Sequence, residues 1–180
     1  EAGITGTGDL LSVDNLKYCK DTYGNSMNVI TADGGFDFSI DFNKQESLAT
    51  NLLFAQVSFA IAMQKQNGHF ILKIFDIFTK TTSDIMYLLS TLYKQVFIVK
   101  PNTSRLANSE KYIVCKYFKE PQHLLMNKII SEYPKLQSKP FISSLFNFNL
   151  DYFYINKIEE YNAIFGQQQI ENISCTLNLI

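Results

Sequence analysis

The alternation of strand-like and helix-like segments between residues 27 and 118 restricts the fold of this chain more than any other feature of its sequence. Runs rich in apolar, β-branched and aromatic residues are typical of strands, and four of them occur, at 27–35, 69–78, 95–101 and 111–118. Helical spacing of apolar residues is found between them, at 45–66 and 81–94. This order is typical of an open α/β sheet with flanking helices. Because only a loop joins the last two strands, we expect that pair to be antiparallel.

The first two strand-like runs are apolar enough to predict buried strands. MNVITADGG at 27–35 ends in Asp33 and two glycines, which indicate a turn, and HFILKIFDIF at 69–78 is expected to be covered on both faces. In the helix between them, one stripe is expected to face the core, formed by Leu48, Leu52, Ala55, Phe59 and Ala62. Gly68 is expected to end that helix.

The pattern changes beyond about residue 120. The stretches 123–133 and 150–165 have helical spacing and are linked through prolines. The sequence therefore predicts a core at 1–119 and a mainly helical extension at 120–180, which packs on that core or on a partner. A chain of 180 residues is long enough to bury a core of its own.

Composition excludes several classes of protein. With 46% apolar and 18% charged residues, the chain contains no apolar run near the roughly 18 residues that a membrane helix needs. Its net charge of −1 does not by itself indicate a nucleic-acid-binding protein. Two histidines and three widely spaced cysteines predict neither a metal site nor a disulfide framework, so a reducing, cytoplasmic location is expected. The abundance of Asn, Lys, Ile, Phe and Tyr suggests an AT-rich genome, as in some large DNA viruses, where the virion is a second possible location.

A lysine in the middle of the apolar run 69–78 needs an explanation. Lys73 can lie near the strand end, with its stem covered and its ammonium in water. Alternatively, it is a functional amine held in a partly buried place, where desolvation lowers the pKa of a lysine.

Topology brings Lys73 close to two carboxylates. In open α/β sheets, ligands bind beyond the carboxyl ends of the strands. Asp33 ends one strand, Lys73 lies near the end of the next, and Glu110 opens the antiparallel strand 111–118. All three are therefore expected at the same edge of the sheet.

Four segments in order resemble one known family. GITGTGDLLSVDNL at 3–16, ADGGFDF at 32–38, GHFILKIFDIFT at 68–79 and KPNTSRLANSEKYIVCK at 100–116 are similar to the FtsJ-type RNA ribose 2′-O-methyltransferases, and among them to the cap-1 mRNA methyltransferases. The resemblance covers residues 1 to 119. It implies the C-terminal part of a Rossmann-like sheet that uses S-adenosylmethionine to methylate the ribose 2′-hydroxyl of RNA, with the first transcribed nucleotide of capped mRNA as the expected substrate.

The resemblance also implies roles for individual residues. The family has a catalytic tetrad Lys-Asp-Lys-Glu, whose last three members match Asp33, Lys73 and Glu110. The cofactor-binding positions match Asp9, Leu10, Asp33 and Gly34, with Asp9 at the adenine. The family's KPxxSR loop matches Lys100, Ser104 and Arg105, which either hold RNA phosphate or close a surface loop through an ion pair.

In this reading Lys73 is the general base that removes the proton of the 2′-hydroxyl. Partial burial and a second ammonium nearby would lower its pKa toward the working pH, while Asp33 would hold it in place. Phe36 and Phe38 either stack on a base or pack their own loop.

The family's glycine-rich cofactor loop and first catalytic lysine precede the GDL segment, so they are expected in a further, N-terminal half of the same protein. GITGTG does not replace that loop, because it follows no strand. The chain alone is therefore expected to be inactive, with RNA and the N-terminal half as its partners. The alternative is a methyltransferase fold that has lost catalysis and serves as an RNA-binding or virion scaffold protein. An unrelated nucleotide-binding α/β domain is a third reading, for which the chain lacks a phosphate loop.

Overall fold

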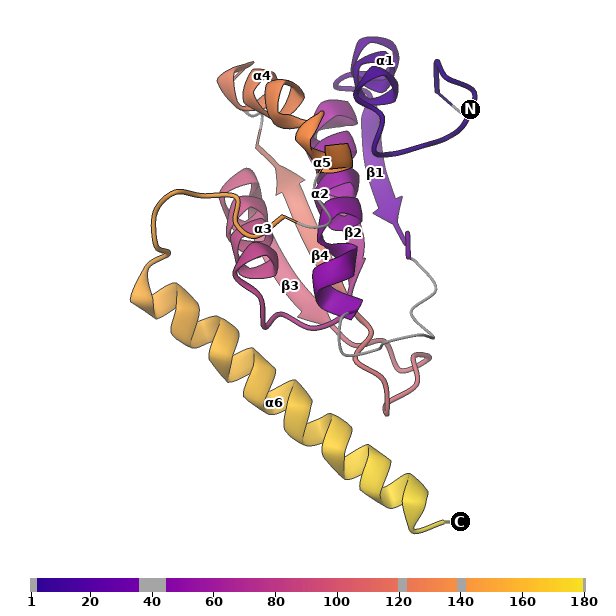
Figure 1. Cartoon of the computed structure of the whole chain (residues 1–180). Helices are drawn as coiled ribbons and strands as arrows, with labels where there is room; N and C mark the ends of the chain where they lie inside the picture. The colour runs from indigo at the N-terminus through magenta and orange to yellow at the C-terminus, as the bar shows by residue number, and fades with distance from the viewer. Residues whose placement is uncertain (1–2, 36–44, 120–122, 139–141, 180) are drawn as a thin grey trace.

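The computed structural model describes residues 3–35, 45–119, 123–138 and 142–179. A four-stranded sheet in the order β1-β2-β4-β3 forms its centre (Figure 1). The strands are β1 (Met27–Ala32), β2 (Gln64–Ile74), β3 (Tyr93–Val99) and β4 (Lys111–Phe118). β1 and β2 are parallel, whereas β4 is antiparallel to both β2 and β3. The mixed α/β fold and the antiparallel last pair are thus confirmed.

Six helices accompany the sheet in the described residues. They are α1 (Val13–Tyr23), α2 (Gln45–Met63), α3 (Lys80–Leu92), α4 (His123–Glu132), α5 (Lys135–Ser138) and α6 (Tyr152–Leu177). The start of α3 was indicated by its sequence, since the Thr79 side chain accepts a hydrogen bond from the Thr82 N–H as an N-cap. α1 was not predicted, although Ser12 caps it in the same way, through the Asn15 N–H.

The helices cover one face of the sheet and leave the other partly open. α2 and α3 cross in front of the strands in Figure 1, and along β2 the residues Phe70, Leu72 and Ile74 are buried against them. Residues that point the opposite way, such as Ile71, are only half-buried. The expectation that this run is covered on both faces is therefore wrong for the described residues. We name the less covered side the open face.

β1 is also less buried than its sequence predicted. It lies at the edge of the sheet, with β2 as its neighbour, and Val29 is 58% exposed. Apolar composition alone does not distinguish an edge strand from a central one, because burial depends on what lies beside and above the strand. Farther along the sheet, Phe97 and Val99 of β3 are likewise exposed.

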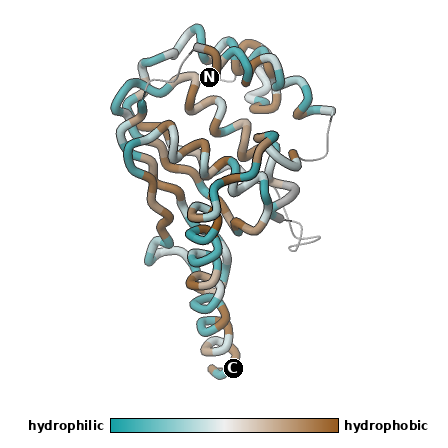
Figure 2. The backbone as a smooth tube through the Cα atoms, turned by 90° about the vertical axis from the view of Figure 1, so that its left-hand side faces the viewer, coloured by the Kyte–Doolittle hydropathy of each residue, from teal (hydrophilic) through white to brown (hydrophobic). Residues whose placement is uncertain are grey.

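α2 is the central helix, buried on more than one stripe. Every residue from 55 to 62 is buried, including Gln56 and Ser58. In Figure 2, brown apolar segments run together through the body of the molecule. The helix ends at Met63, earlier than the expected range of 45–66. Gln64 already belongs to β2, and its side-chain amide donates to the Met27 carbonyl oxygen at 2.9 Å.

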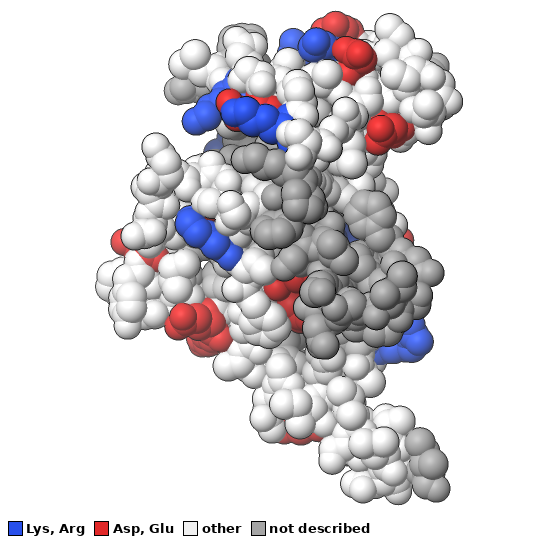
Figure 3. Space-filling model, viewed as in Figure 1, with Lys and Arg blue, Asp and Glu red and all other residues white. Residues whose placement is uncertain are grey.

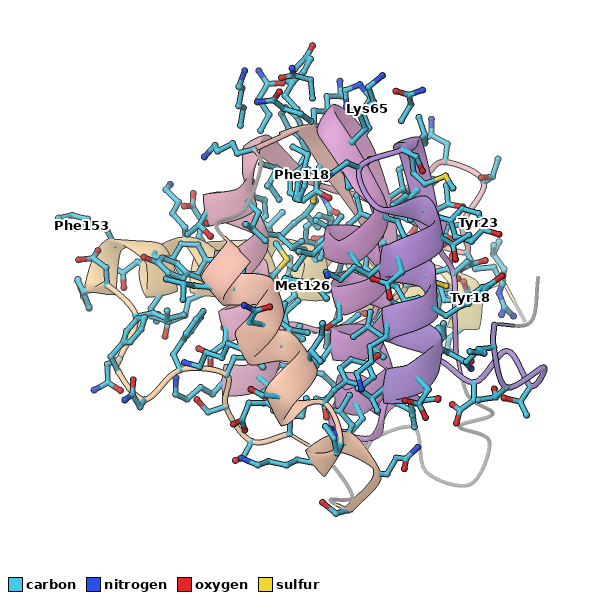
Figure 4. All side chains as sticks on the ribbon, turned by 90° about the horizontal axis from the view of Figure 1, so that it is seen from above. Tyr18, Tyr23, Lys65, Phe118, Met126 and Phe153 are labelled. Carbon is cyan, nitrogen blue, oxygen red and sulfur yellow. The ribbon has the colours of Figure 1, made fainter. Side chains whose placement is uncertain are left out.

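α6 is longer than predicted and projects along the lower side of the body (Figure 1). It continues through Gly166 to Leu177 and does not end near residue 165. Ile158 is buried, whereas Phe153 near its start points away from the body in Figure 4 and is 80% exposed. Within the described ranges, no helix combines the length and apolar character that crossing a membrane requires.

Candidate active site at the carboxyl edge of the sheet

Strand register places three of the site residues in one row. Ala32 of β1 pairs with Leu72 of β2, so Asp33 follows beside Lys73. Lys73 pairs in turn with Tyr112 of β4. Directly opposed residues point to the same face of a sheet, so Lys73 and Tyr112 share the open face. The predicted meeting of Asp33 and Lys73 at this edge is therefore observed.

Lys73 and Asp33 form a close ion pair. The Lys73 Nζ lies 2.8 Å from Asp33 Oδ1, and it also donates to the Asp33 carbonyl oxygen at 3.1 Å. The Lys73 side chain is 15% exposed, whereas that of Asp33 is 69% exposed. The lysine stem is thus covered while its amine is held at the rim, where an incoming group can approach it.

Glu110 and Tyr112 extend this cluster across β4. Glu110 precedes the strand and lies two residues before Tyr112, so both belong to the face that carries Lys73. Burial raises the pKa of the Tyr112 phenol, as do the negative charges of Glu110 and Asp33, while Lys73 lowers it. All three predicted residues therefore influence the pKa of the Tyr112 phenol. Tyr112 was missed in the sequence, although its alternation with Glu110 placed it on the same face.

The Glu110 carboxylate is held from the loop before β4. Ser104 Oγ donates to Glu110 Oε1 at 2.8 Å. An amine with carboxylates at hydrogen-bond distance or nearby is suited to accept a proton from a bound hydroxyl and to keep the resulting ammonium in place.

Gly34 is fixed by the central helix. Its N–H donates to Gln56 Oε1 at 2.9 Å, and a Cβ at position 34 would lie 2.8 Å from that oxygen. A side chain at this position would therefore displace Gln56. Gln56 was noticed in the sequence only as a polar residue in a helical apolar run, which was the signal for this role. Beside these residues is a cavity of about 20 Å³, which Lys73 also lines and which holds about one water molecule.

The loop between β3 and β4 is closed from within. Lys100 Nζ donates to the carbonyl oxygen of Asn108 at 2.6 Å, to Asn108 Oδ1 at 2.7 Å and to the carbonyl oxygen of Glu110 at 2.9 Å. Burial lowers the pKa of Lys100, as does the charge of Lys111. Lys100 and Ser104 thus shape the loop that carries Glu110, whereas Arg105 is exposed. Their role toward RNA stays a prediction.

Asp9 and Leu10 lie in the loop before α1. In Figure 1 this loop is beside α1 in the upper part of the molecule, away from the β3–β4 loop. Asp9 Oδ1 accepts the Leu11 N–H at 2.8 Å, and its side chain is otherwise exposed. The structure does not bring Asp9 into contact with Asp33, so a ligand that touches both must be elongated. Phe36 and Phe38 lie outside the described residues.

A second lysine–aspartate pair lies on the helix-covered face. Lys111 is 5% exposed, and its Nζ lies 3.4 Å from Asp76 Oδ1. It also donates to the carbonyl oxygens of Phe75 and Ser109 at 3.3 and 3.0 Å, and lies 5.4 Å from the centre of the Phe165 ring of α6. Burial lowers the pKa of Lys111, while Asp76 raises it. No pattern in the sequence distinguished Lys111 from the surface lysines.

The described residues contain no group of three or more metal-ligand side chains, and their charges are mixed. On the face seen in Figure 3, lysines and acidic residues alternate in small groups with white surface between them.

Comparisons with known proteins agree with the motifs. The model of the FtsJ-like methyltransferase family matches residues 2–118. The chain is 39% identical over 124 residues to a cap-specific mRNA (nucleoside-2′-O-)-methyltransferase 1 from Danio rerio, covering 66% of this chain and 15% of that protein. The protein of the same name from Trypanosoma brucei brucei is 38% identical over 115 residues, covering 63% of this chain and 31% of its own length. That from Trypanosoma cruzi is 39% identical over 118 residues, with 64% and 33% covered. The chain thus spans a third or less of these relatives.

Proposed function

This chain belongs to the FtsJ-like methyltransferase family, and from that premise we propose that its protein transfers a methyl group from S-adenosylmethionine to the ribose 2′-hydroxyl of RNA. The proposed substrate is the first transcribed nucleotide of capped mRNA, in line with the names of the relatives. The observation that carries the proposal is the Lys73–Asp33 pair at 2.8 Å, on the strand register that also brings in Tyr112, with Glu110 just before the same strand.

Lys73 is the proposed general base. In its neutral amine form, Nζ accepts the proton of the 2′-hydroxyl as that oxygen takes the methyl group, which S-adenosylmethionine would supply from its sulfonium with the bonding electrons staying on sulfur. Asp33 stabilises the ammonium that Lys73 becomes, at a distance where such pairs are strong. Glu110 and Tyr112 are placed to orient the ribose on the open face. Much of the rate enhancement then comes from positioning.

The residues of this chain fit S-adenosylmethionine at two places, its adenine and the end that carries the methyl group. S-adenosylmethionine supplies the methyl group on a positively charged sulfur. The exposed Asp9 carboxylate offers an acceptor for the adenine amino group, with Leu10 beside it. Asp33 and Gly34 lie at the end where Lys73 works, and Gln56 keeps that backbone in position.

The RNA is proposed to approach across the β3–β4 loop. Arg105 is exposed there, and Lys100 and Ser104 keep the loop in shape. In this proposal Arg105 pairs with a phosphate of the strand, while the other two act on RNA through the loop they support.

A second segment of the same protein is proposed to cover the part of the open face that lies away from Lys73 and Tyr112. Val29 is 58% exposed, Phe97 45% and Val99 40%, and such surface is usually covered by another element. The chain also spans only 15% to 33% of the relatives. Slower amide exchange in β1 of the full-length protein than in residues 1–180 alone would support this cover, and equal exchange would refute it.

We also propose that the protein acts in the cytoplasm or, if it is viral, in the host cytoplasm or the virion. The cysteine content and the composition support this location. Cell fractionation tests this location, and recovery of the full-length protein from the nucleus would contradict it.

The direct test is transfer of labelled methyl by the full-length protein to capped RNA. A matched RNA with a 2′-deoxy sugar at the first transcribed nucleotide should accept no label at that position, and uncapped RNA shows whether the cap is required. Calorimetry with S-adenosylmethionine accompanies the assay. Binding of RNA with neither cofactor binding nor methyl transfer would overturn the proposal in favour of a non-catalytic RNA-binding or scaffold protein.

A further inference from the structure

The loop that carries Asp9 and Leu10 is held by the segment beyond the β-sheet. The Tyr133 hydroxyl donates to the Leu10 carbonyl oxygen at 2.6 Å, across 123 positions of sequence. Four residues later, the Gln137 side chain donates to the Leu11 carbonyl oxygen at 3.3 Å. Two consecutive carbonyls of this loop are thus bonded to side chains from α5 and the turn before it.

The same loop is anchored from α1. Asn15 Nδ2 donates to the Asp9 carbonyl oxygen at 3.0 Å, and Asn15 Oδ1 accepts the Thr5 N–H at 3.1 Å. Asn15 is only 2% exposed. The carbonyl groups of residues 9, 10 and 11 are therefore all bonded to side-chain donors.

Tyr133 is suited to a fixed contact. It is fully buried, its N–H donates to the Ile129 carbonyl oxygen at 2.9 Å, and its ring packs on Phe54 of α2 with centroids 6.4 Å apart. In Figure 4, α4, which carries Met126, lies beside the central helices. Met126 and Ile129 of α4 are buried, so Tyr133 follows a well-packed helix. Burial raises the pKa of the Tyr133 phenol, and so does the charge of Asp9. The phenol therefore stays protonated and keeps its donor.

The consequence falls on Asp9. Its backbone is fixed on both sides, while its carboxylate stays exposed and uses Oδ1 for the Leu11 N–H. Across the described ranges, the structure gives that carboxylate no lysine or arginine partner. An exposed anion on a rigid backbone is oriented for a ligand that donates hydrogen bonds.

We propose that Tyr133 is a positioning residue of the cofactor site: by holding the Leu10 carbonyl, it sets the direction of the Asp9 carboxylate toward the adenine amino group. The inference rests on the proposed function, since it needs a cofactor with an adenine. It gives part of the helical extension, which lies beyond the family match at 2–118, a role in the methyltransferase site.

The chain offers a matched control for the test. Tyr93, at the start of β3, is also buried, and its hydroxyl likewise makes one hydrogen bond in the described residues, to Gln64 Oε1 at 3.2 Å. Tyr133→Phe and Tyr93→Phe remove the same atom from a buried ring. Both variants are therefore expected to lose similar stability, but only the first should affect the Asp9 loop.

The first measurement is cofactor binding by the full-length protein. Tyr133→Phe should weaken the Kd for S-adenosylmethionine by about 2- to 10-fold, the range that one hydrogen bond provides. The KM for the cofactor should rise with it, while kcat and the KM for RNA stay unchanged. Tyr93→Phe should bind cofactor as the wild type does. Equal cofactor affinities in both variants would overturn the inference.

The second measurement needs no cofactor. In the same full-length variants, the Leu11 and Ser12 amides should exchange with deuterium faster in Tyr133→Phe than in Tyr93→Phe. Unchanged exchange would show that Tyr133 does not hold the loop. If the wild type binds no S-adenosylmethionine, the proposed function fails and takes the cofactor part of this inference with it. If the wild type binds and Tyr133→Phe binds equally, only this inference fails.

Discussion

Lys73 and Lys111 stand near the same edge of the sheet, each beside an aspartate, but on opposite faces. Lys73 pairs with Asp33 at 2.8 Å on the open face, next to Tyr112. Lys111 pairs with Asp76 at 3.4 Å on the helix side, under the Phe165 ring. The two ion pairs have the same chemistry, yet only the first leaves its carboxylate mostly exposed, at 69% against 33%.

The difference shows what makes a lysine available for chemistry. Two carbonyl oxygens, one carboxylate and one aromatic ring surround Lys111, so its amine is committed to the fold. Among the described residues, Lys73 has one partner residue, Asp33, which supplies both of its acceptors. Its amine is therefore less committed to the described part of the fold than that of Lys111, as suits a proton acceptor.

We call Lys73–Asp33 the open pair and Lys111–Asp76 the closed pair. The largest expected effect comes from removing the Lys73 amine of the open pair. Lys73→Met in the full-length protein keeps the covered stem but leaves no group to accept the proton. Methyl transfer to capped RNA should fall by about 100-fold or more, the range for a lost general base, while the unfolding transition shifts little. Activity within a factor of two of wild type would remove Lys73 from the mechanism.

The corresponding change in the closed pair should act on stability. Lys111→Met breaks the contacts with Asp76 and with the carbonyl oxygens of Phe75 and Ser109. We expect the free energy of unfolding to fall by about 1–3 kcal/mol, less than for a fully buried pair because Asp76 is one-third exposed. Urea unfolding monitored by circular dichroism measures it. A variant as stable as wild type would show that the closed pair contributes nothing to folding.

Stability at alkaline pH should also depend on the helix-covered face. Cys115 lies in β4 on the side of Lys111, and burial raises the pKa of its thiol from 9.0 to about 12. The unfolded chain releases this proton near pH 9 and the folded protein only near pH 12, so the stabilisation is complete below pH 9 and is lost as the pH rises between these values.

Cys115→Ala isolates this contribution. Between pH 9 and pH 10 the wild type should lose about 1 kcal/mol more unfolding free energy than the variant. Buried tyrosines titrate alike in both proteins and cancel in the difference. Parallel pH profiles would mean that the thiol is accessible in the folded protein.

The smallest expected effect concerns α6, whose Phe165 ring lies against the Lys111 amine. Gly166 follows Phe165 in α6, and a Cβ added there would meet no atom within 4 Å. Gly166→Ala should stabilise the helix by about 0.5–1 kcal/mol, seen as slower amide exchange in α6. Exchange at Lys73 should not change. Faster exchange in α6 would show that the glycine is needed for a bend.

Much of the fold could be predicted because local patterns agreed with the final structure. The antiparallel β3–β4 pair followed from the loop at 100–110, and α3 followed from its capping threonines and apolar spacing. The expected edge position of Asp33, Lys73 and Glu110 followed from strand order alone. The predictions were wrong where contacts with other elements decide burial or length. β1 was expected to be buried but forms an edge, and the helix expected at 150–165 continues to Leu177.

By itself, the sequence determined the order of the four strands and of the helices between them, and which strands end at a common edge, because periodicity and strand order are local properties of the chain. Only the tertiary structure decided which lysine has a free side, since Lys73 and Lys111 look alike in sequence and differ in what packs over them. It also decided that Tyr133 reaches Leu10, because a contact across 123 positions depends on how helices stack and not on any local pattern.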